Sequence, residues 1–370
     1  MKIAVVHDWL VTNAGAEKVL SEIIHLYPEA DIFALVDFLS EEERKEIIMG
    51  KEVHTSFIQY LPFSKHRFRN YLPLFPMAIE RFNLTAYDLI ISSSWAVAKG
   101  VKTSNKQLHV NYCHTPIRYA WDLYEEYTKD LRGVKKYVVQ KTLEYLRRWD
   151  YRVSSRVDFF IANSHFVKKR IATNYGRDAV VIYPPVDTHA FTLRVNKEEF
   201  YVTVSRLVPY KKVSMIVKAF NKSGKKLVVI GSGEEQQYIA SIAQENITIL
   251  GWQKRELIIE YMQRARAFVY AAEEDFGIVP VEAMACGTPV IAYGVGGIRD
   301  SVIENETGVF FTEQTPDSLN TAIETFESRY FDTIAISKHA KKFSKEIFQN
   351  RFKAFICAKL DERVNGCKSS

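Results

Sequence analysis

The segment 274–289, EDFGIVPVEAMACGTP, gathers the residues best suited to bind an anionic ligand that carries hydroxyl groups. Gly277 stands just before a helix that Pro280 is suited to begin, and the first backbone N–H groups of a helix attract anions. Glu274 and Glu282 flank that helix start, where both carboxylates could accept hydrogen bonds from one sugar or ribose. Acidic residues at a helix start also simply complement the helix dipole, which explains either glutamate alone. Together with the glycine and the proline, they favour a binding site.

A second candidate segment is cationic. Residues 205–212, SRLVPYKK, follow a predicted strand. Arg206 offers a planar fork and Lys211 a point charge, and the two could clamp a diphosphate. The alternative is an ordinary solvated loop, and this segment alone does not decide between the two.

Two features of the N-terminal half are less specific. Residues 13–17, NAGAE, form a small-residue turn around Gly15 before a predicted helix, which suits a phosphate or a sugar but also a plain tight turn. His114 directly follows a predicted strand, where a histidine can reach a ligand or be structural. No GxGxxG follows the first strand of either half, so a nicotinamide-dinucleotide fold is not favoured.

The elements that must position these residues are short apolar strands alternating with amphipathic helices. Strands that are apolar on both faces are typical of parallel sheets covered by helices. Two successive series predict an α/β protein with two Rossmann-like, doubly wound domains facing a central cleft, with the candidates at the carboxyl ends of strands. The predicted strands are 3–6, 32–36, 89–92, 108–112, 159–162 and 180–183, then 201–204, 227–230, 247–250, 267–270, 289–292 and 309–311.

The break between the two series lies at the double proline within Tyr183–Asp187. We expect an N-terminal domain over 1–190, a C-terminal domain over 191–345, and a helix with a polar tail over 346–370 that returns toward the first domain.

Composition excludes several classes of protein. The 370 residues are 47% hydrophobic and 25% charged, as in a folded protein. No uncharged apolar run approaches the roughly 20 residues of a membrane-spanning helix. The four cysteines show neither a zinc-site spacing nor a disulfide framework, which predicts a cytoplasmic protein without a structural metal.

Basic and aromatic residues cluster in two patches, 57–82 and 129–156, and the second has nine Lys/Arg against three Asp/Glu. Both patches suit an anionic membrane surface, although solvated helix faces with buried aromatic residues explain them equally well. Nucleic acid is not favoured as a partner, because no known binding module is present and the excess charge is confined to one half.

Four further segments extend the pattern over nearly the whole chain: VHDWL at 6–10, IISSS at 90–94, YCHTPIRYAWD at 112–122 and VIYPPVD at 181–187. In this order and spacing, the chain resembles the retaining glycosyltransferases of family 4, which have the GT-B fold. Within that family it most resembles the WbaZ-like O-antigen mannosyltransferases.

The resemblance implies a role for each candidate residue. The family's E-x7-E motif falls on Glu274, which would contact hydroxyls of the donor sugar, and on Glu282, which would contact the ribose of the nucleotide. Arg206 and Lys211 match the pair that holds the donor phosphates. The remaining matches are Gly15 and the backbone N–H groups of Gly277, Ile278 and Val279 around the diphosphate, and His114 beside the reacting sugar.

Three positions depart from the family pattern without removing a central group. Lys212 stands where a glycine is common, Ser232 replaces a frequent aspartate, and Asp300 stands where a glutamate is more usual.

The implied activity is transfer of a hexose to a lipid-linked or polysaccharide acceptor of a cell-surface glycan such as O-antigen, with the anomeric configuration retained. The subfamily likeness points to mannose from GDP-mannose, with no metal or other cofactor required. Domain 1–190 would bind the acceptor and domain 191–345 the nucleotide sugar, at the inner face of the cytoplasmic membrane. The alternatives are a UDP-hexose donor, a GT-B nucleotide-sugar epimerase, and a sugar- or membrane-binding scaffold without catalysis.

Overall fold

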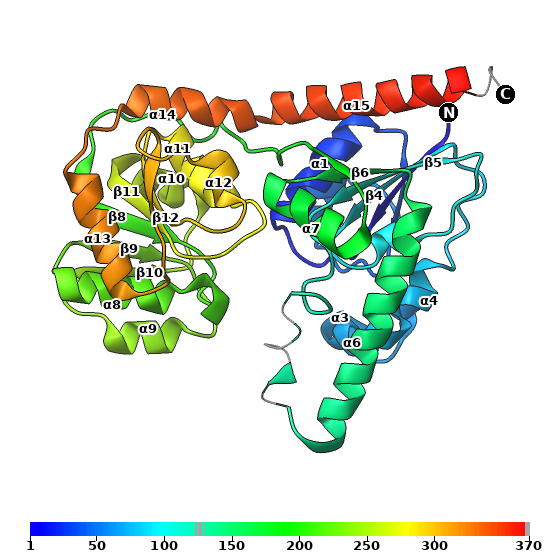
Figure 1. Ribbon diagram of the computed structural model, residues 1–370, viewed down its shortest axis with the longest axis horizontal. Coiled ribbons are helices and arrows are strands. Elements are labelled where there is room, and N and C mark those ends of the chain that lie inside the picture. Colours follow the sequence, from blue (N-terminus) through cyan, green and yellow to red (C-terminus); the bar gives the residue numbers. More distant parts are fainter. Residues whose placement is uncertain (123, 125–127, 130, 367–370) are drawn as a thin grey trace. The chain divides into compact units, whose positions relative to one another are not determined.

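The computed structural model describes residues 1–122, 124, 128–129 and 131–366 (Figure 1). The chain folds as two units. The first comprises Met1–Pro184 together with the chain from Phe348 onward, and the second comprises Pro185–Ile347. Residue 130 of the second basic patch and the last four residues, 367–370, of the helix and tail predicted over 346–370 lie outside the described residues.

The first unit is built on a seven-stranded sheet in the order β3-β2-β1-β4-β5-β6-β7, in which every neighbouring pair is parallel. Its strands are β1 (Ile3–His7), β2 (Asp31–Ala34), β3 (Val53–Thr55), β4 (Leu89–Ser94), β5 (Leu108–Cys113), β6 (Phe159–Ala162) and β7 (Ala179–Val181). Its α-helices are α1 (Gly15–Leu26), α2 (Glu41–Ile48), α3 (Ser64–Arg67), α4 (Phe75–Ile79), α6 (Gly133–Val153) and α7 (His165–Tyr175). Short 3₁₀ turns are η1 (Phe57–Tyr60), η2 (Phe68–Leu74), η3 (Ala98–Gly100) and η4 (Ser154–Arg156).

Both faces of this sheet are buried, which explains why its strands are apolar without alternation. Ile3 and Val5 of β1 pack on one face with α1 and α2. Ala4 and Val6 point to the other face, where α4 and α6 cover them. Figure 1 shows the amino-terminal part of α6 extending away from the sheet.

The last helix, α15 (Lys345–Gly366), completes the core of the first unit. Phe348, Phe352 and Ile356 recur at every fourth position and are almost fully buried against the α1 side of the sheet. Arg363 donates a hydrogen bond to the carbonyl oxygen of Gln107 at 2.6 Å. The end of the chain therefore packs with its beginning.

The second unit has a six-stranded parallel sheet in the order β10-β9-β8-β11-β12-β13, the strand order of dinucleotide-binding folds. Its strands are β8 (Glu198–Val204), β9 (Leu227–Ile230), β10 (Ile247–Gly251), β11 (Ala265–Tyr270), β12 (Val290–Tyr293) and β13 (Gly308–Phe311). Its helices are α8 (Val213–Ser223), α9 (Gln236–Ile242), α10 (Arg255–Arg264), α11 (Ile278–Ala285), α12 (Ile298–Ser301), α13 (Pro316–Glu327) and α14 (Thr333–Ala340), with 3₁₀ turns η5 (Pro209–Lys211) and η6 (Lys341–Phe343).

The observed elements differ from the prediction in two respects. The sequence does not reveal β3, because this edge strand has three residues and none of them is fully buried. The two units divide at Pro184–Pro185, within the break predicted at Tyr183–Asp187 and ahead of the expected domain bound at residue 190.

Candidate active site

Each sheet reverses its winding direction between two central strands, and doubly wound sheets bind ligands in the loops that follow these strands. In the second unit the central strands are β8 and β11, which pair directly. Residues 205–212 follow β8, and residues 271–277 follow β11. The fold therefore brings the predicted cationic and acidic segments to one edge of the same sheet.

Lys211 and Glu274 form the central contact of this edge. The Lys211 ammonium donates to Oε1 of Glu274, and the hydroxyl of Tyr270 donates to Oε2. Burial, and then the charge of Glu274, raises the pKa of Tyr270 well above its ordinary value, so this tyrosine remains a hydrogen-bond donor. The side chains of Lys211 and Glu274 are 14% and 25% exposed, which leaves both accessible to a ligand.

Arg206 lies on the loop that also carries Lys211, two positions after the end of β8. Its side chain is exposed and has neither an ion pair nor a hydrogen bond within the part of the chain that the structure describes. A free guanidinium fork on a loop with a lysine suits an anion such as a diphosphate.

The amino-terminal end of α11 completes the candidate anion site. Gly277 caps the helix with a φ of 88°, a left-handed conformation that residues with a Cβ rarely adopt, and it has no side chain to cap the first turn. The N–H groups of Ile278 and Val279 lie in that first turn, where helical N–H groups lack acceptors within the helix. Glu282 lies one turn further along α11 and is 7% exposed.

The loop after β12 fixes the backbone of Glu274. The N–H of Gly297 donates to the carbonyl oxygen of Glu274 at 2.8 Å, and Gly296 pairs with Glu274 in an isolated parallel β-bridge. A Cβ added to Gly297 would lie 2.1 Å from the carbonyl oxygen of Asp275, so no larger residue fits. This glycine pair therefore holds the acidic segment in place.

Lys212 shows why a glycine is common at its position. It precedes α8 with a φ of 57° and a ψ of 26°, a left-handed conformation that is strained for a residue with a Cβ. We expect Lys212→Gly to raise the free energy of unfolding by up to about 1 kcal/mol, because the strain disappears. Urea unfolding measures the change, and Lys212→Ala is the matched control because it keeps the strain. An equal response of both variants would show that the charge, not the backbone, matters here.

In the first unit the central strands are β1 and β4. Asp8 follows β1, is fully buried, and accepts hydrogen bonds from four successive backbone N–H groups after β4. Trp95 and Ala96 donate to Oδ2 at 2.6 and 2.8 Å. Val97 and Ala98 donate to Oδ1 at 2.6 Å each. One carboxylate thus joins the ends of both central strands.

His114 directly follows β5 and is partly exposed. Its Nε2 lies 2.8 Å from Oγ of Ser93, and its carbonyl oxygen accepts a hydrogen bond from Asn163 at 3.0 Å. Burial, and then the charge of His7, lowers the pKa of His114 to about 3. The imidazole is therefore neutral near pH 7 and can share hydrogen bonds with a hydroxyl without carrying a charge.

Gly15 is the first residue of α1, and the start of this helix is anchored to the end of β1. The N–H of Ala14 donates to Oε2 of Glu17 at 3.0 Å. Glu17 is 2% exposed, and its Oε1 lies 3.7 Å from Nε2 of the fully buried His7. Gly15 and His114 therefore both lie at the carboxyl edge of the first sheet.

Two histidines of the first unit, the fully buried His109 and the partly exposed His114, predict a pH-dependent stability. Burial lowers the pKa of His109 to about 4 and that of His114 to about 3, against an ordinary value near 6.5. The unfolded chain therefore binds more protons than the folded protein at mildly acidic pH, so stability is highest above about pH 6.5 and falls below it. Each histidine should cost up to about 2 kcal/mol between about pH 7 and about pH 5.

Thermal unfolding at several pH values measures this effect. His109→Gln should unfold at a lower temperature but with a weaker dependence on pH than the wild type. Parallel pH curves for the two proteins would show that His109 does not titrate on unfolding.

Two family models match the chain: Glycosyltransferase Family 4 over residues 14–190, and Glycosyl transferases group 1 over residues 187–349. Two solved glycosyltransferases share the fold over 97% of this chain and 100% of their own. HepE of Anabaena in complex with UDP has a TM-score of 0.68 at 19% identity, and the lipopolysaccharide outer core galactosyltransferase WaaB has a TM-score of 0.69 at 18% identity. The chain has the GT-B fold, and each of its two halves matches a glycosyltransferase family model.

Curated relatives match parts of this GT-B protein. An uncharacterized glycosyltransferase of Methanocaldococcus jannaschii is 27% identical over 194 residues, which are 51% of the chain and 55% of the relative. The GDP-mannose-dependent alpha-(1-6)-phosphatidylinositol monomannoside mannosyltransferase of Mycolicibacterium smegmatis is 28% identical over 207 residues, 46% of the chain and 53% of the relative. The chain spans about half the length of these curated relatives.

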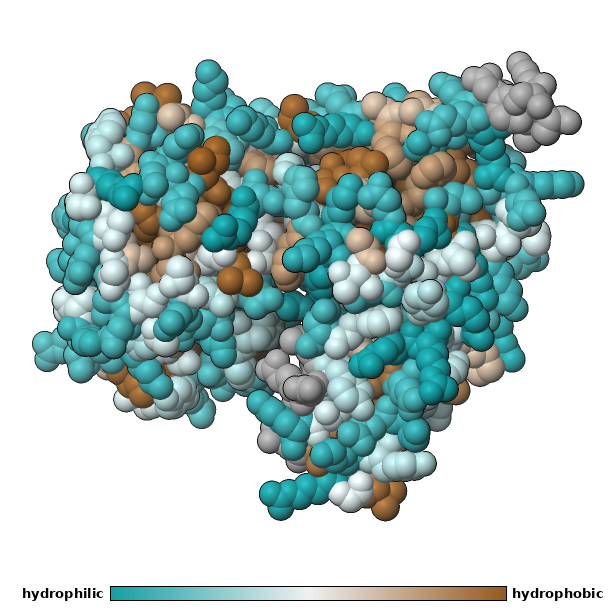
Figure 2. Space-filling model, in the orientation of Figure 1, coloured by the Kyte–Doolittle hydropathy of each residue, from teal (hydrophilic) through white to brown (hydrophobic). Residues whose placement is uncertain are grey.

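The two basic patches of the GT-B protein belong partly to its core. Within 57–82, Phe68 and Phe75 are buried, whereas Tyr60 and Phe63 are 81% and 76% exposed. Within 129–156, α6 buries its Trp149 side and leaves other apolar side chains in solvent: Val134, Tyr137, Val138, Tyr145 and Tyr151. Figure 2 shows a small hydrophobic group at the amino-terminal end of α6, among hydrophilic residues. The surface left for a membrane is smaller than the sequence patches.

Within the described residues of the GT-B protein, no helix is long and apolar enough to cross a membrane. The same residues contain no group of three or more His, Cys, Asp or Glu that could hold a metal ion.

Each unit thus brings several predicted residues to its own carboxyl edge: Lys211, Glu274 and Gly277–Val279 in the second, Gly15 and His114 in the first. The sequence prediction omitted the side chains that position them. Asp8 and Tyr270 are the clearest cases, because both lie at the end of a buried strand and bond to groups of the neighbouring strand end or loop. The sequence signal that could have identified both residues is a polar side chain at the end of an apolar strand.

Proposed function

We propose that the protein is a retaining hexosyltransferase that transfers a sugar from a nucleoside diphosphate to an acceptor hydroxyl. The observation that supports this most is the Lys211–Glu274 pair beside the uncapped start of α11, at the switch point of the second sheet. At this sheet edge, the Lys211 ammonium and the N–H groups of α11 match the negatively charged phosphates of such a donor. The Glu274 carboxylate matches the hydroxyls of its sugar.

In this proposal, Arg206, Lys211 and the N–H groups of Gly277–Val279 hold the diphosphate. Gly15 adds the small-residue helix start of the first unit. Glu282 accepts hydrogen bonds from the ribose, and Glu274 accepts them from the transferred sugar, as the family likeness implies. The second unit then binds the nucleotide sugar and the first unit the acceptor.

During transfer, the bond between the anomeric carbon and the diphosphate oxygen breaks, the acceptor oxygen forms the new bond on the same face, and its proton passes to an oxygen of the departing diphosphate. The diphosphate gains negative charge as it departs, so fixed cations and helix N–H groups lower the barrier. No metal is needed for this stabilisation when Arg206 and Lys211 supply it. Glu274 is already bonded to Lys211 and Tyr270, which suits sugar binding better than nucleophilic attack. Neutral His114 would bond a hydroxyl of the reacting sugar.

GDP-mannose is the donor we propose, because one relative is a GDP-mannose-dependent mannosyltransferase. A UDP-hexose is the second candidate, because HepE was solved in complex with UDP. For the acceptor we propose a lipid-linked or polysaccharide glycan such as O-antigen, elongated at the inner face of the cytoplasmic membrane. The exposed aromatic and basic residues of 57–82 and 129–156 would contact anionic lipid.

A panel of GDP- and UDP-sugars tests the donor by the shift that each causes in the thermal unfolding temperature. GDP-mannose should stabilise the protein most, and incubation with a glycan acceptor should release GDP and form a linkage with retained configuration, seen by nuclear magnetic resonance. Turnover of the donor without any acceptor would instead favour an epimerase. Absence of any shift would contradict the proposal.

A further inference from the structure

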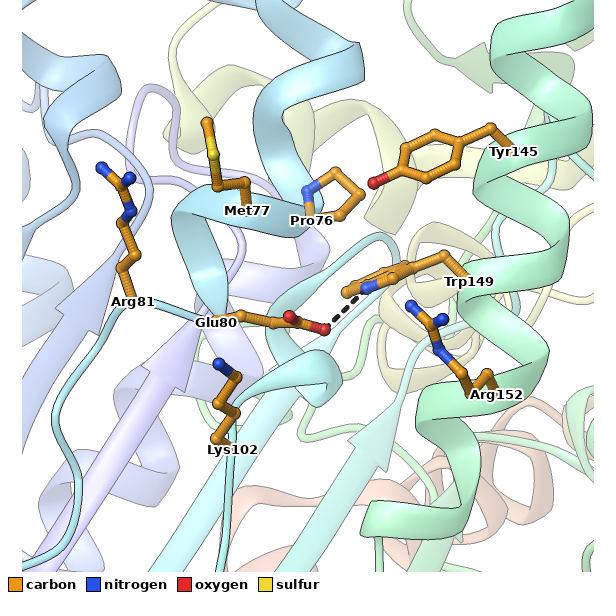
Figure 3. Close-up of a pocket in the computed structure, with 8 residues that line it drawn as sticks. All are labelled: Pro76, Met77, Glu80, Arg81, Lys102, Tyr145, Trp149 and Arg152. Carbon is orange, nitrogen blue, oxygen red and sulfur yellow. Dashed lines mark hydrogen bonds between the residues drawn. The ribbon is translucent and has the colours of Figure 1, made fainter.

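The first unit contains a pocket of about 240 Å³ between α4 and α6, which no step of the proposed transfer uses (Figure 3). Lys102 and Arg152, which line it, lie on the chain segments that lead into β5 and β6, before these strands begin. Gly15 and His114, by contrast, follow the carboxyl ends of their strands. The pocket is therefore separate from the candidate active-site edge of this unit.

The charge of this pocket favours an anion. Arg81, Lys102 and Arg152 line it, and none of them has an ion pair among the residues that the structure describes. Its single carboxylate, Glu80, is already engaged: Oε1 accepts hydrogen bonds from the Trp149 indole and from Arg156, both at 2.9 Å. The Arg81 guanidinium lies over the Phe57 ring at 5.2 Å. Lys102 and Arg152 are thus the cations available to an anion, beside an acid that is already neutralised.

The rim of the pocket is apolar. Met77 and Tyr145 line it and are 42% and 46% exposed. Two turns before Tyr145 on α6, Tyr137 and Val138 are 62% and 54% exposed. Residues spaced by seven or eight share a helix face, so these exposed apolar side chains lie on the face of α6 that leads to the pocket. Lys141 lies between them and over the Tyr137 ring, which adds a cation to this face.

We propose that this pocket binds the phosphate-bearing headgroup of an anionic phospholipid. The Arg152 fork and the Lys102 ammonium match a phosphodiester, and the exposed apolar rim matches the glycerol and the first part of the acyl chains. The volume is roughly eight times the share of one water molecule, enough for a phosphate with its attached glycerol. A soluble phosphate would use the cations but leave the apolar rim in water. The inference rests on the membrane association in the proposed function and gives that contact a defined site.

Vesicle binding of the full-length protein tests the site. The pocket variant is Lys102→Gln with Arg152→Gln, two exposed residues whose loss should not affect folding. The matched control is Arg132→Gln with Lys135→Gln, which removes the same charge from exposed positions at the start of α6 outside the pocket. On vesicles of phosphatidylcholine with phosphatidylglycerol, the pocket variant should bind at least about tenfold more weakly than the control.

Two further arms identify the ligand. On vesicles whose charge comes from oleic acid instead of a phospholipid, both variants should bind alike, because no phosphate headgroup is present. Glycerol phosphate in solution should bind the wild type far more weakly than the phospholipid vesicles do. GDP binding by calorimetry should be the same in both variants, which separates this site from the proposed active site.

Equal weakening of the two variants on phosphatidylglycerol would overturn the proposal, because surface charge would then be sufficient. Tight binding of glycerol phosphate without binding of vesicles would assign the pocket to a soluble phosphate and overturn the lipid assignment.

Discussion

Arg206→Ala is expected to lower kcat by roughly 10²–10³-fold, the usual loss when one preorganised group that stabilises developing charge is removed. The guanidinium has no partner in the described part of the donor-free protein, so its removal breaks no existing contact. Its contribution should therefore arise only with the donor, when charge develops on the departing diphosphate. Steady-state kinetics with the preferred nucleotide sugar measures the change.

Three further measurements make this result specific. Lys218→Ala removes an exposed cation of α8 and should leave kcat unchanged. Arg206→Lys should recover part of the rate, because it restores the charge but not the fork. The thermal unfolding temperature of Arg206→Ala should match that of the wild type. Normal kcat and KM in Arg206→Ala would remove this residue from the site.

Glu274→Ala should lower kcat/KM by roughly 10–100-fold, the equivalent of losing a hydrogen bond to a charged acceptor. Its carboxylate holds both the Lys211 ammonium and the Tyr270 hydroxyl. Without Glu274, the sugar loses its acceptor and Lys211 loses the contact that orients it. Kinetics of the variant, with Glu273→Ala as the neighbouring control, measures the effect.

A double-mutant cycle separates these two contributions. Because Lys211 and Glu274 are in direct contact, the double replacement should cost less than the sum of the single ones. Strictly additive losses would mean that the two residues act on the donor independently and that the pair has no role in positioning Lys211.

Apolar runs were sufficient to predict the interior strands of both sheets. Ile3–His7 and Leu227–Ile230 are covered by helices on both faces, so burial alone makes them continuous hydrophobic runs. The position of Lys211 and Glu274 at one edge also follows from the pattern, because parallel strands place their carboxyl ends together. The edge strand Val53–Thr55 could not be predicted, since its partial burial gives it no such run.

The contacts within the site depend on tertiary structure. Asp8 and Trp95 are far apart in sequence, and their hydrogen bond exists only because β1 and β4 are neighbours in the sheet. The left-handed conformation of Lys212 is likewise set by the turn before α8. Burial within the basic patches could not be predicted from the sequence. In this irregular segment of short helices, residue spacing does not distinguish the buried Phe75 from the exposed Phe63.

The central claim is that the second unit binds the donor nucleotide at the start of α11. Calorimetric titration of GDP into the wild type and into Glu282→Ala tests it most directly, with Glu324→Ala, an exposed glutamate of α13, as the control. We predict that the wild type and the control bind GDP equally, and that Glu282→Ala binds it about tenfold or more weakly because the ribose loses its carboxylate acceptor. Equal affinity in all three proteins would contradict the assignment of this site.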